Sequence, residues 1–261
     1  MEKPILKIVK IGGNVIEDAF LLNDFLKDFS AMEGFKILVH GGGKKATELS
    51  KSLGLEPKMV NGRRVTDTAN LELVTMVYAG LINKNMVAQL QKCNCNALGL
   101  SGADANVIKA HKRVVKEVDY GFAGDVDAVN GLVLTQFLQQ GLTPVFCAIT
   151  HDKNGQLLNT NADTVASEIA VEMANYFTVE LHFLFELKGV LRSIDDENSV
   201  IEQMDLESYQ NLVEKGVIAG GMLPKLHNCF NALQKGVAKV KIGNAQYIKN
   251  PNSIHTTLSL K

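Results

Sequence analysis

The chain has 261 residues, of which 46% are hydrophobic and 21% are charged, and its formal net charge is −1. A chain of this size and composition can bury a sizeable core, as one large α/β domain or as two small lobes. The near-neutral charge offers no electrostatic surface for nucleic acid or an anionic membrane, and no apolar run is long enough to span a bilayer, so we expect neither as a partner.

Strand-like and helix-like patterns alternate along the first part of the chain. Short apolar runs that end at glycine predict strands, and apolar residues recurring every three to four positions predict helices. In chain order we expect strand Ile5–Ile11, helix Ala19–Met32, strand Phe35–His40, helix Ala46–Leu53, a helical stretch Leu71–Leu90 that Gly80 could break, strand Asn96–Leu100, hairpins within Val107–Asn130 that turn at Gly121 and Gly124, helix Leu132–Gln139 and strand Thr143–Ile149.

The same alternation continues to the C-terminal end. We expect helix Ala162–Met173, strand Phe177–Phe185, helices Leu206–Lys215 and Met222–Leu233, and strand Val237–Ile242. Short strands alternating with helices predict an α/β fold with a mostly parallel sheet that is covered on both faces. A soft boundary near Asn175 divides the chain into lobes 1–174 and 175–261.

Two glycine-rich turns follow the first two predicted strands. One is Gly12-Gly13, which comes shortly after Lys10, and the other is Gly41-Gly42-Gly43, which comes directly after His40. In an open parallel sheet, ligands bind beyond the carboxyl ends of the strands, where glycine lets backbone N–H groups approach an anion. Each turn alone could be a tight turn only, but together they favour phosphate binding. Neither turn matches the P-loop or the dinucleotide fingerprint.

Two lysines stand at positions where a bound anion would suit them. Lys10 ends a largely apolar strand beside the first glycine turn, and it could either face solvent or point at phosphates. Lys225 follows Pro224, which is tolerated only in the first turn of a helix. A cation is unfavourable at that positive helix end unless an anion binds there, and a solvated lysine is the other interpretation.

Polar side chains precede the helix predicted at 162–173. Asn161 could simply be its N-cap, and Asp163 could be a first-turn acid that complements the helix dipole. Capping does not require Asn159, however, and a carboxylate at position 163 could hold two lysines in place. Upstream, Arg63 and Arg64 lie in a predicted turn before a helix that Thr66 or Asp67 would cap, and they could be solvated or could fork onto a substrate carboxylate.

These residues occur in five short motifs whose order matches a known family. The motifs are K-I-G-G-N at 10–14, H-G-G-G at 40–43, N-G-R-R-V-T at 61–66, L-N-T-N-A-D at 158–163 and G-G-M-L-P-K at 220–225. In them the chain resembles, over nearly its whole length, the amino acid kinase family, and within it the enzymes that phosphorylate N-acetyl-L-glutamate in arginine biosynthesis. The last two motifs are the most specific.

The resemblance implies a three-layer αβα sandwich of the carbamate kinase-like type, with a mostly parallel central sheet. Lobe 1–174 would hold the acyl-amino acid and dimerise, and lobe 175–261 would hold ATP with Mg²⁺ bound mainly through its phosphates. No protein-held metal is implied. The implied residues are catalytic Lys10, Asp163 and Lys225, backbone donors Gly12, Gly13, Gly42 and Gly43, and substrate-binding Arg64, Asn159 and Asn161, with Arg64 on the α-carboxylate.

The chain departs from the family pattern at three places. Arg63 stands where the family usually has Leu, and it could favour an acyl group with its own negative charge, such as succinyl, or simply face solvent. Phe185-Glu186 replaces the usual Ser-Asp after the first strand of the nucleotide lobe. The usual Gly-Thr is missing around His255-Thr256, so the details of the ATP pocket are open.

The resemblance also bears on assembly and compartment. Relatives that arginine inhibits have an additional N-terminal helix before the first strand, whereas here the first strand starts at Ile5, so we expect a homodimer without that form of feedback. The four cysteines have no metal-ligand or redox spacing, which favours reduced thiols in a cytoplasmic protein, and Cys93 and Cys95 have no assigned role.

Two other functions stay open. The first is a sibling kinase, namely glutamate 5-kinase, carbamate kinase or aspartokinase, against which Asn159, Asn161 and the motif at 61–66 argue. The second is a binding protein that has the same fold but no catalysis, against which Lys10, Asp163 and Lys225 argue.

Overall fold

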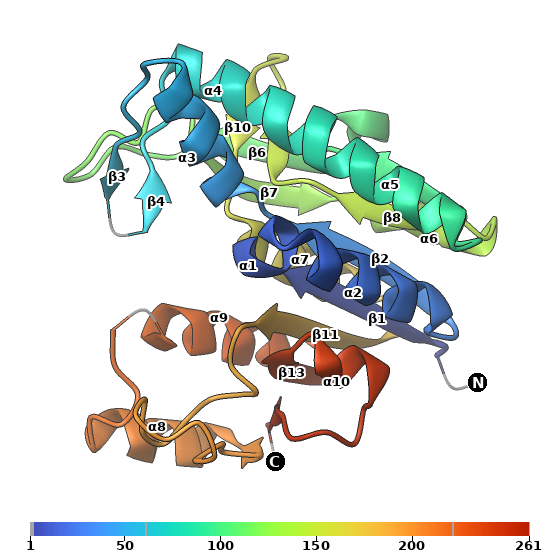
Figure 1. Cartoon of the computed structure of the whole chain (residues 1–261), viewed down its shortest axis with the longest axis vertical. Coiled ribbons are helices and arrows are strands. Elements are labelled where there is room, and N and C mark those ends of the chain that lie inside the picture. The colour runs from blue at the N-terminus through green and yellow to red at the C-terminus, as the bar shows by residue number, and fades with distance from the viewer. Residues whose placement is uncertain (1–2, 61, 221, 261) are drawn as a thin grey trace.

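The computed structural model of the chain describes residues 3–60, 62–220 and 222–260 (Figure 1). Asn61 and Gly221, which belong to two of the sequence motifs, lie outside these residues. No helix within the described ranges is long and apolar enough to cross a membrane.

The centre of the molecule is an eight-stranded sheet. In order across the sheet its strands are β12 (Gln203–Met204), β14 (Thr256–Leu258), β13 (Lys239–Asn244), β11 (Thr178–Phe185), β1 (Ile5–Ile11), β2 (Phe35–His40), β8 (Thr143–Phe146) and β5 (Ala97–Leu100). All neighbours are parallel except β13 and β14, which are antiparallel. The predicted mostly parallel sheet is therefore confirmed, and its strands read as near-continuous apolar runs because both faces are buried.

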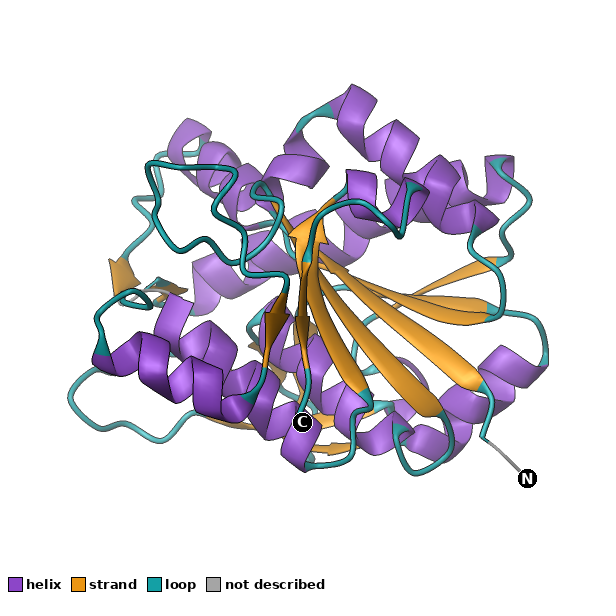
Figure 2. Ribbon diagram, turned by 90° about the horizontal axis from the view of Figure 1, so that it is seen from below, coloured by secondary structure: helices purple, strands orange, loops and turns teal. Residues whose placement is uncertain are grey.

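Helices cover both faces of this sheet (Figure 2). The helices on one face are α2 (Ala19–Ala31), α5 (Asn83–Lys92) and α10 (Gln246–Lys249), and those on the other are α6 (Gly131–Gln139), α7 (Ala162–Met173) and α9 (Met222–Gln234). Helix α7 packs on β1, β2 and β11 because it presents an apolar face along its whole length, including Val165, Ala166, Ile169 and Met173. The remaining helices are α1 (Gly13–Glu17), α3 (Gly43–Ser52), α4 (Thr68–Thr75) and α8 (Leu206–Glu214).

Two smaller sheets lie beside the central one. The strands of the first, in order, are β10 (Leu157–Asn159), β9 (Ile149–His151), β6 (Ile108–Lys112) and β7 (Gly124–Val129), and a short 3₁₀ turn at Asp104–Asn106 precedes β6. The second is the two-stranded pair β3 (Met59–Val60) and β4 (Arg63–Arg64). The two arginines therefore lie in a short strand, so the predicted turn was wrong at these two positions. The predicted cap of the next helix is confirmed, because Asp67 caps α4.

Two further predictions needed correction in this region. The strand predicted at Thr143–Ile149 is two strands, because the chain leaves the central sheet after Phe146 and joins the small sheet at Ile149. Gly121 has a φ of 64°, which favours glycine, but it forms an isolated β-bridge with Thr66 and not a turn. Gly124 is the first residue of β7, where a Cβ atom would come within 2.6 Å of the Thr160 hydroxyl. Close approach, and not a turn, is the reason for this glycine.

The long helical stretch is continuous, and the possible break at Gly80 does not occur. A π-helical segment, η1 (Met76–Ile82), joins α4 to α5 without interruption. This segment brings Tyr78 and Ile82 against Gly42, whose position leaves no room for a Cβ atom: the nearest side-chain atoms would be 2.6 and 2.7 Å away. A π-helical turn of this kind often occurs at functional sites, and here it packs directly beneath the second glycine turn.

Candidate active site

The two glycine turns meet at one edge of the central sheet. Strands β1 and β2 are parallel neighbours, so their carboxyl ends, at Ile11 and His40, lie side by side. Gly42 occupies the N-cap of α3, and no side chain caps that helix. The first N–H groups of α3, at the positive end of the helix dipole, are therefore suited to an anion.

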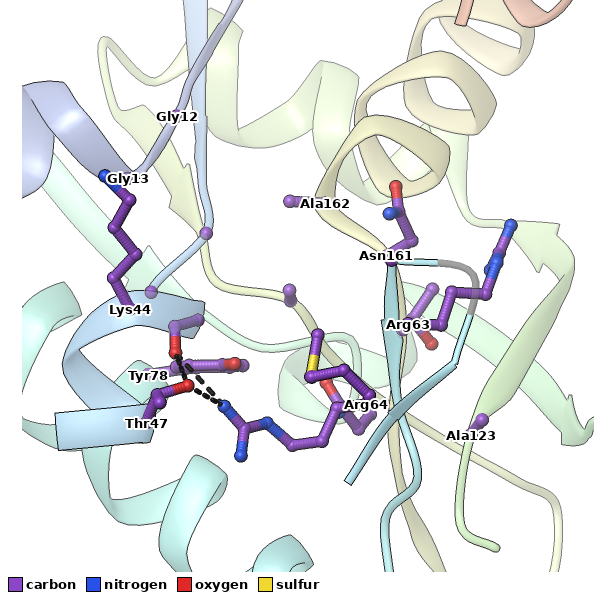
Figure 3. A pocket seen from close by; sticks show the side chains of 18 of the residues that line it. Gly12, Gly13, Lys44, Thr47, Arg63, Arg64, Tyr78, Ala123, Asn161 and Ala162 are labelled. Atoms are coloured by element: carbon purple, nitrogen blue, oxygen red, sulfur yellow. Dashed lines mark hydrogen bonds between the residues drawn. The ribbon is translucent and has the colours of Figure 1, made fainter. Parts of the chain in front are cut away.

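Two cavities open at this edge. One, which we name the substrate cavity after the role proposed for it below, has a volume of about 640 Å³ and is lined by Arg63, Arg64, Asn159 and Asn161 together with both glycine turns (Figure 3). The C-terminal cavity, about 430 Å³, is lined by Phe185, Glu186, Met222 and Lys225 among others. Four residues line both cavities, namely Lys10, Gly12, Gly13 and Lys44. A molecule in one cavity would therefore meet a molecule in the other at Lys10.

Lys10, Asp163 and Lys225 come together between the cavities. The Asp163 carboxylate lies 2.7 Å from the Lys10 ammonium and 4.0 Å from the Lys225 ammonium. Lys10 comes from the end of β1, and only 8% of its surface is exposed. Lys225 comes from the first turn of α9, which begins at Met222, as the sequence predicted. Three elements far apart in the sequence thus place two cations on one carboxylate.

Burial and charge act in opposite directions on this cluster. Burial by itself would raise the pKa of Asp163, but the charges of Lys10 and Lys225 and a hydrogen bond from Lys10 outweigh it, so the pKa lies below its ordinary value. Burial lowers the pKa of Lys225; the charge of Asp163 opposes this, and that of Lys10 reinforces it. Asp163 is a carboxylate at neutral pH and keeps both ammonium groups near the cleft.

The 159–163 segment both caps a helix and places a carboxylate beside the two lysines. Asn161 is the N-cap of α7, and its side-chain oxygen accepts the N–H groups of Asp163 at 2.8 Å and Thr164 at 3.1 Å. The cap fixes the first turn, and that turn directs the Asp163 side chain to the lysines. Asn159 ends β10 and donates its amide to the Thr66 hydroxyl at 3.0 Å, which ties it to the start of the arginine segment.

Arg64 forms one wall of the substrate cavity. It is buried, and its Nη2 donates to the Gly43 carbonyl at 3.1 Å and to the Thr47 hydroxyl at 2.6 Å (Figure 3). Its Nη1 is also buried, and it has no hydrogen-bond partner among the described residues. A buried donor without a partner is costly, so this nitrogen is suited to an acceptor on a ligand, above all a carboxylate.

Arg63 lies on another wall of the same cavity (Figure 3). It is half-buried, and its guanidinium makes no hydrogen bond or ion pair within the described part of the chain. Burial lowers the pKa of Arg63, the nearby Arg113 lowers it further, and Asp125 offsets part of this. Asp125 is itself bound by Arg113 through hydrogen bonds from Nε of 3.1 and 3.2 Å. Arg63 stays charged at neutral pH without a partner of its own.

Three residues that line the cavities were not predicted from the sequence. Lys44 lies in both cavities, pairs with Glu17 at 3.2 Å, and also donates to the Asn14 side chain. Its position directly after the glycine run was the signal that could have found it. Thr47 and Tyr78 line the substrate cavity, but they lie inside ordinary helical patterns, which carried no signal for them.

The chain is similar to known proteins along nearly its whole length. The sequence model of the amino acid kinase family matches residues 6–244. A curated relative, the acetylglutamate kinase of Cytophaga hutchinsonii, is 55% identical over 242 residues, which is 92% of each chain. The solved Streptococcus mutans protein smu.665 matches with a TM-score of 0.78 at 27% identity, covering 98% of this chain and 99% of its own. The carbamate kinase of Giardia lamblia bound to AMP-PNP matches with a TM-score of 0.70 at 15% identity, covering 100% and 99%.

Proposed function

Because this chain belongs to the amino acid kinase family, we propose that it transfers the γ-phosphoryl group of ATP to the γ-carboxylate of N-acetyl-L-glutamate, the second step of arginine biosynthesis. The relative from Cytophaga hutchinsonii, which bears the name acetylglutamate kinase, supports this acceptor through 55% identity over 92% of the chain. The single observation that carries the mechanism is the cluster of Lys10, Asp163 and Lys225 where the two cavities meet.

The reaction needs no general base. A carboxylate is already ionised at neutral pH, so its oxygen can attack the γ-phosphorus directly while the bond to the bridging oxygen of ADP breaks. The products are an acyl phosphate and ADP, and no proton has to move. Catalysis then consists of holding the two oxygens in line and neutralising the charge that spreads over the phosphoryl oxygens.

The site residues divide between the two substrates. Lys10 would stabilise the phosphoryl group in transit, Lys225 would hold the ATP phosphates, and Asp163 would organise both lysines. The backbone N–H groups of Gly12, Gly13, Gly42 and Gly43 would serve as further donors, at the positive end of α3 in the case of the second pair. Arg64, Asn159 and Asn161 would hold the amino-acid part, with Arg64 on the α-carboxylate.

ATP and Mg²⁺ fit this set of residues. Two ammonium groups and two glycine turns whose following helices, α1 and α3, have no side-chain cap suit a triphosphate. Among the described residues no three His, Cys, Asp or Glu side chains gather to hold a metal ion. Mg²⁺ commonly binds through substrate phosphates and water, so the nucleotide would bring its own ion, which neutralises charge on the phosphates.

We further propose that lobe 1–174 binds the acyl-amino acid and forms a homodimer, and that lobe 175–261 binds ATP. Closure of the lobes would keep water from the acyl phosphate. Sedimentation of the purified chain tests the dimer. The four free cysteines support a reducing, cytoplasmic setting.

Trapping the product with hydroxylamine tests the reaction. With ATP, Mg²⁺ and N-acetyl-L-glutamate, we expect ADP release together with a hydroxamate, because hydroxylamine captures acyl phosphates. Reactions without acceptor, and reactions with glutamate, aspartate or carbamate in its place, are the controls. Turnover of one of those acceptors alone would support a sibling kinase. Absence of ADP release with every acyl-glutamate would support a binding protein.

Arg64→Lys is expected to raise the KM for N-acetyl-L-glutamate by roughly tenfold or more and to change the KM for ATP little. Lysine keeps the charge but loses the planar fork that can hold Gly43 and Thr47 on one nitrogen and a carboxylate on the other. Steady-state kinetics with each substrate varied in turn measure this. An equal rise in both KM values would argue against a specific contact with the acyl-amino acid.

A second acceptor, N-succinyl-L-glutamate, is favoured by one observation. Arg63 is charged, half-buried and without a partner in the wall of the substrate cavity. An acyl group that ends in a carboxylate would provide that partner.

Arg63→Leu separates the two acceptors. If Arg63 binds a succinyl carboxylate, the variant should lose about tenfold in kcat/KM for N-succinyl-L-glutamate relative to N-acetyl-L-glutamate. Arg113→Leu, which removes a neighbouring guanidinium already paired to Asp125, is the matched control. An unchanged preference in Arg63→Leu would remove the succinyl alternative and leave the kinase assignment as it is.

A further inference from the structure

Phe185 lies against both lysines of the active site. It is the last residue of β11, and its ring lines the C-terminal cavity. The ammonium of Lys225 lies 3.2 Å from the centroid of this ring, and that of Lys10 lies 5.4 Å from it. Both distances are within the range of a cation–π contact, and the Lys225 contact is close. The ring is thus a third neighbour of the two cations, besides the shared carboxylate of Asp163.

The Phe185 ring packs on a buried neighbour. Phe183, two residues earlier on the same face of β11, is 1% exposed, and its ring stacks on that of Phe185 with centroids 6.2 Å apart and planes within 5°. Because Phe183 pairs in register with Lys10 on the adjacent strand β1, the two rings and the Lys10 side chain lie on one face of the sheet. Phe185 therefore provides a fixed surface at the edge of the site.

Lys225 is held less firmly by Asp163 than Lys10 is. Lys10 forms a close ion pair with Asp163 at 2.7 Å, whereas Lys225 is 4.0 Å from the same carboxylate, and the two cations repel each other. No other carboxylate pairs with Lys225 among the described residues. A long, flexible ammonium side chain with one distant counter-charge has several rotamers open to it. The negative face of an aromatic ring restricts these without neutralising the charge.

We propose that Phe185 is a positioning residue, whose ring holds the Lys225 ammonium at the mouth of the C-terminal cavity, ready for the phosphates of ATP. The inference rests on the proposed kinase function, in which Lys225 binds those phosphates. Phosphate oxygens in the cavity would then meet the Lys225 ammonium beside the ring. Phe185 acts through Lys225 and takes no part in the transfer itself.

Two substitutions distinguish the effect of the aromatic π face of Phe185 from the effect of its apolar bulk. Phe185→Leu keeps an apolar side chain but loses the π face, and Phe185→Tyr keeps the face. We expect Phe185→Leu to weaken AMP-PNP binding about fivefold, measured by calorimetry, and to raise the KM for ATP by a similar factor. The change in kcat should be smaller. Phe185→Tyr should stay near the wild-type values. Equal losses in both variants, or none in Phe185→Leu, would overturn the proposal.

A double-mutant cycle and a spectroscopic signature exclude a merely structural effect. In a Lys225→Met background, Phe185→Leu should no longer weaken AMP-PNP binding, because the ring acts only through the ammonium. The ε-methylene signal of Lys225, assigned by comparison with Lys225→Met, should be shifted upfield by the ring in the wild type and in Phe185→Tyr, and not in Phe185→Leu. A full additional loss in the Lys225→Met background, or an unshifted signal in the wild type, would contradict the contact.

The same experiments distinguish the inference from the function on which it rests. If the wild-type chain does not bind AMP-PNP at all, the proposed kinase function fails, and the role of Phe185 fails with it. If AMP-PNP binds and Phe185→Leu binds it equally well, only the role of Phe185 is overturned.

Discussion

Lys10→Met is expected to lower kcat by roughly a thousandfold, with little change in AMP-PNP affinity. Removing one preorganised donor to a developing charge costs about two to three orders of magnitude in other enzymes, and cations that stabilise a phosphoryl group in transit can contribute more. Lys10 lies at the meeting point of the two cavities and is 8% exposed, so little water can replace it. ADP release at saturating substrates measures the effect.

Lys7→Met is the matched control for this experiment. Lys7 lies on the same strand, three residues earlier and on the opposite face of the sheet, where it donates to the Glu33 carbonyl at 3.3 Å. It should leave kcat within about twofold of wild type, since it is remote from both cavities. Thermal unfolding of both variants shows whether each is folded. A folded Lys10→Met variant that loses less than tenfold in kcat would remove Lys10 from the centre of the mechanism.

Asp163→Asn is expected to lower kcat/KM for ATP by about a hundredfold and to move the alkaline limb of its pH profile to lower pH. The amide keeps the shape of the side chain but leaves two ammonium groups without their shared counter-charge. Burial lowers the pKa of Lys225, Lys10 lowers it further, and Asp163 opposes both. Without the carboxylate, the pKa of Lys225 falls further, so Lys225 loses its proton at a lower pH.

The direction of this shift is the critical readout. A loss of rate alone could follow from a small displacement of α7, but such a displacement would not by itself lower the pH at which activity declines. Glu168→Gln, on the same helix and outside both cavities, is the control and should keep the wild-type profile. An alkaline limb that stays in place or moves to higher pH in Asp163→Asn would contradict the coupling between Asp163 and Lys225.

Local signals predicted several elements residue by residue. Strands Ile5–Ile11 and Phe35–His40 and helix Ala162–Met173 have the predicted bounds. In each case the information is carried by neighbours in the chain: glycines directly after an apolar run, or a capping Asn161 before an apolar face that repeats at helical spacing. Such signals need no knowledge of what the element packs against.

Strand pairing and packing contacts were less predictable, because they depend on residues far away in the sequence. The run Thr143–Ile149 is apolar after its first residue, and apolar character alone cannot show that its two ends pair in different sheets. The same holds for Gly124, whose neighbour Thr160 is 36 positions away. Gly80 was a possible helix break, yet the helix continues there as a π-helical segment that packs on Gly42.

By itself, the sequence determined the fold class and the set of polar residues that follow the strands, because parallel strands bring their carboxyl ends to one edge. Only the tertiary structure decided which side chains meet: that Asp163 lies 2.7 Å from Lys10, that one buried nitrogen of Arg64 has no partner among the described residues, and that the Lys225 ammonium lies 3.2 Å from the centre of the Phe185 ring. The physical reason is that a side-chain contact depends on the packing of several elements that are far apart in the sequence. A helix cap, or a repeat of apolar residues at helical spacing, depends only on residues that are close together in the chain.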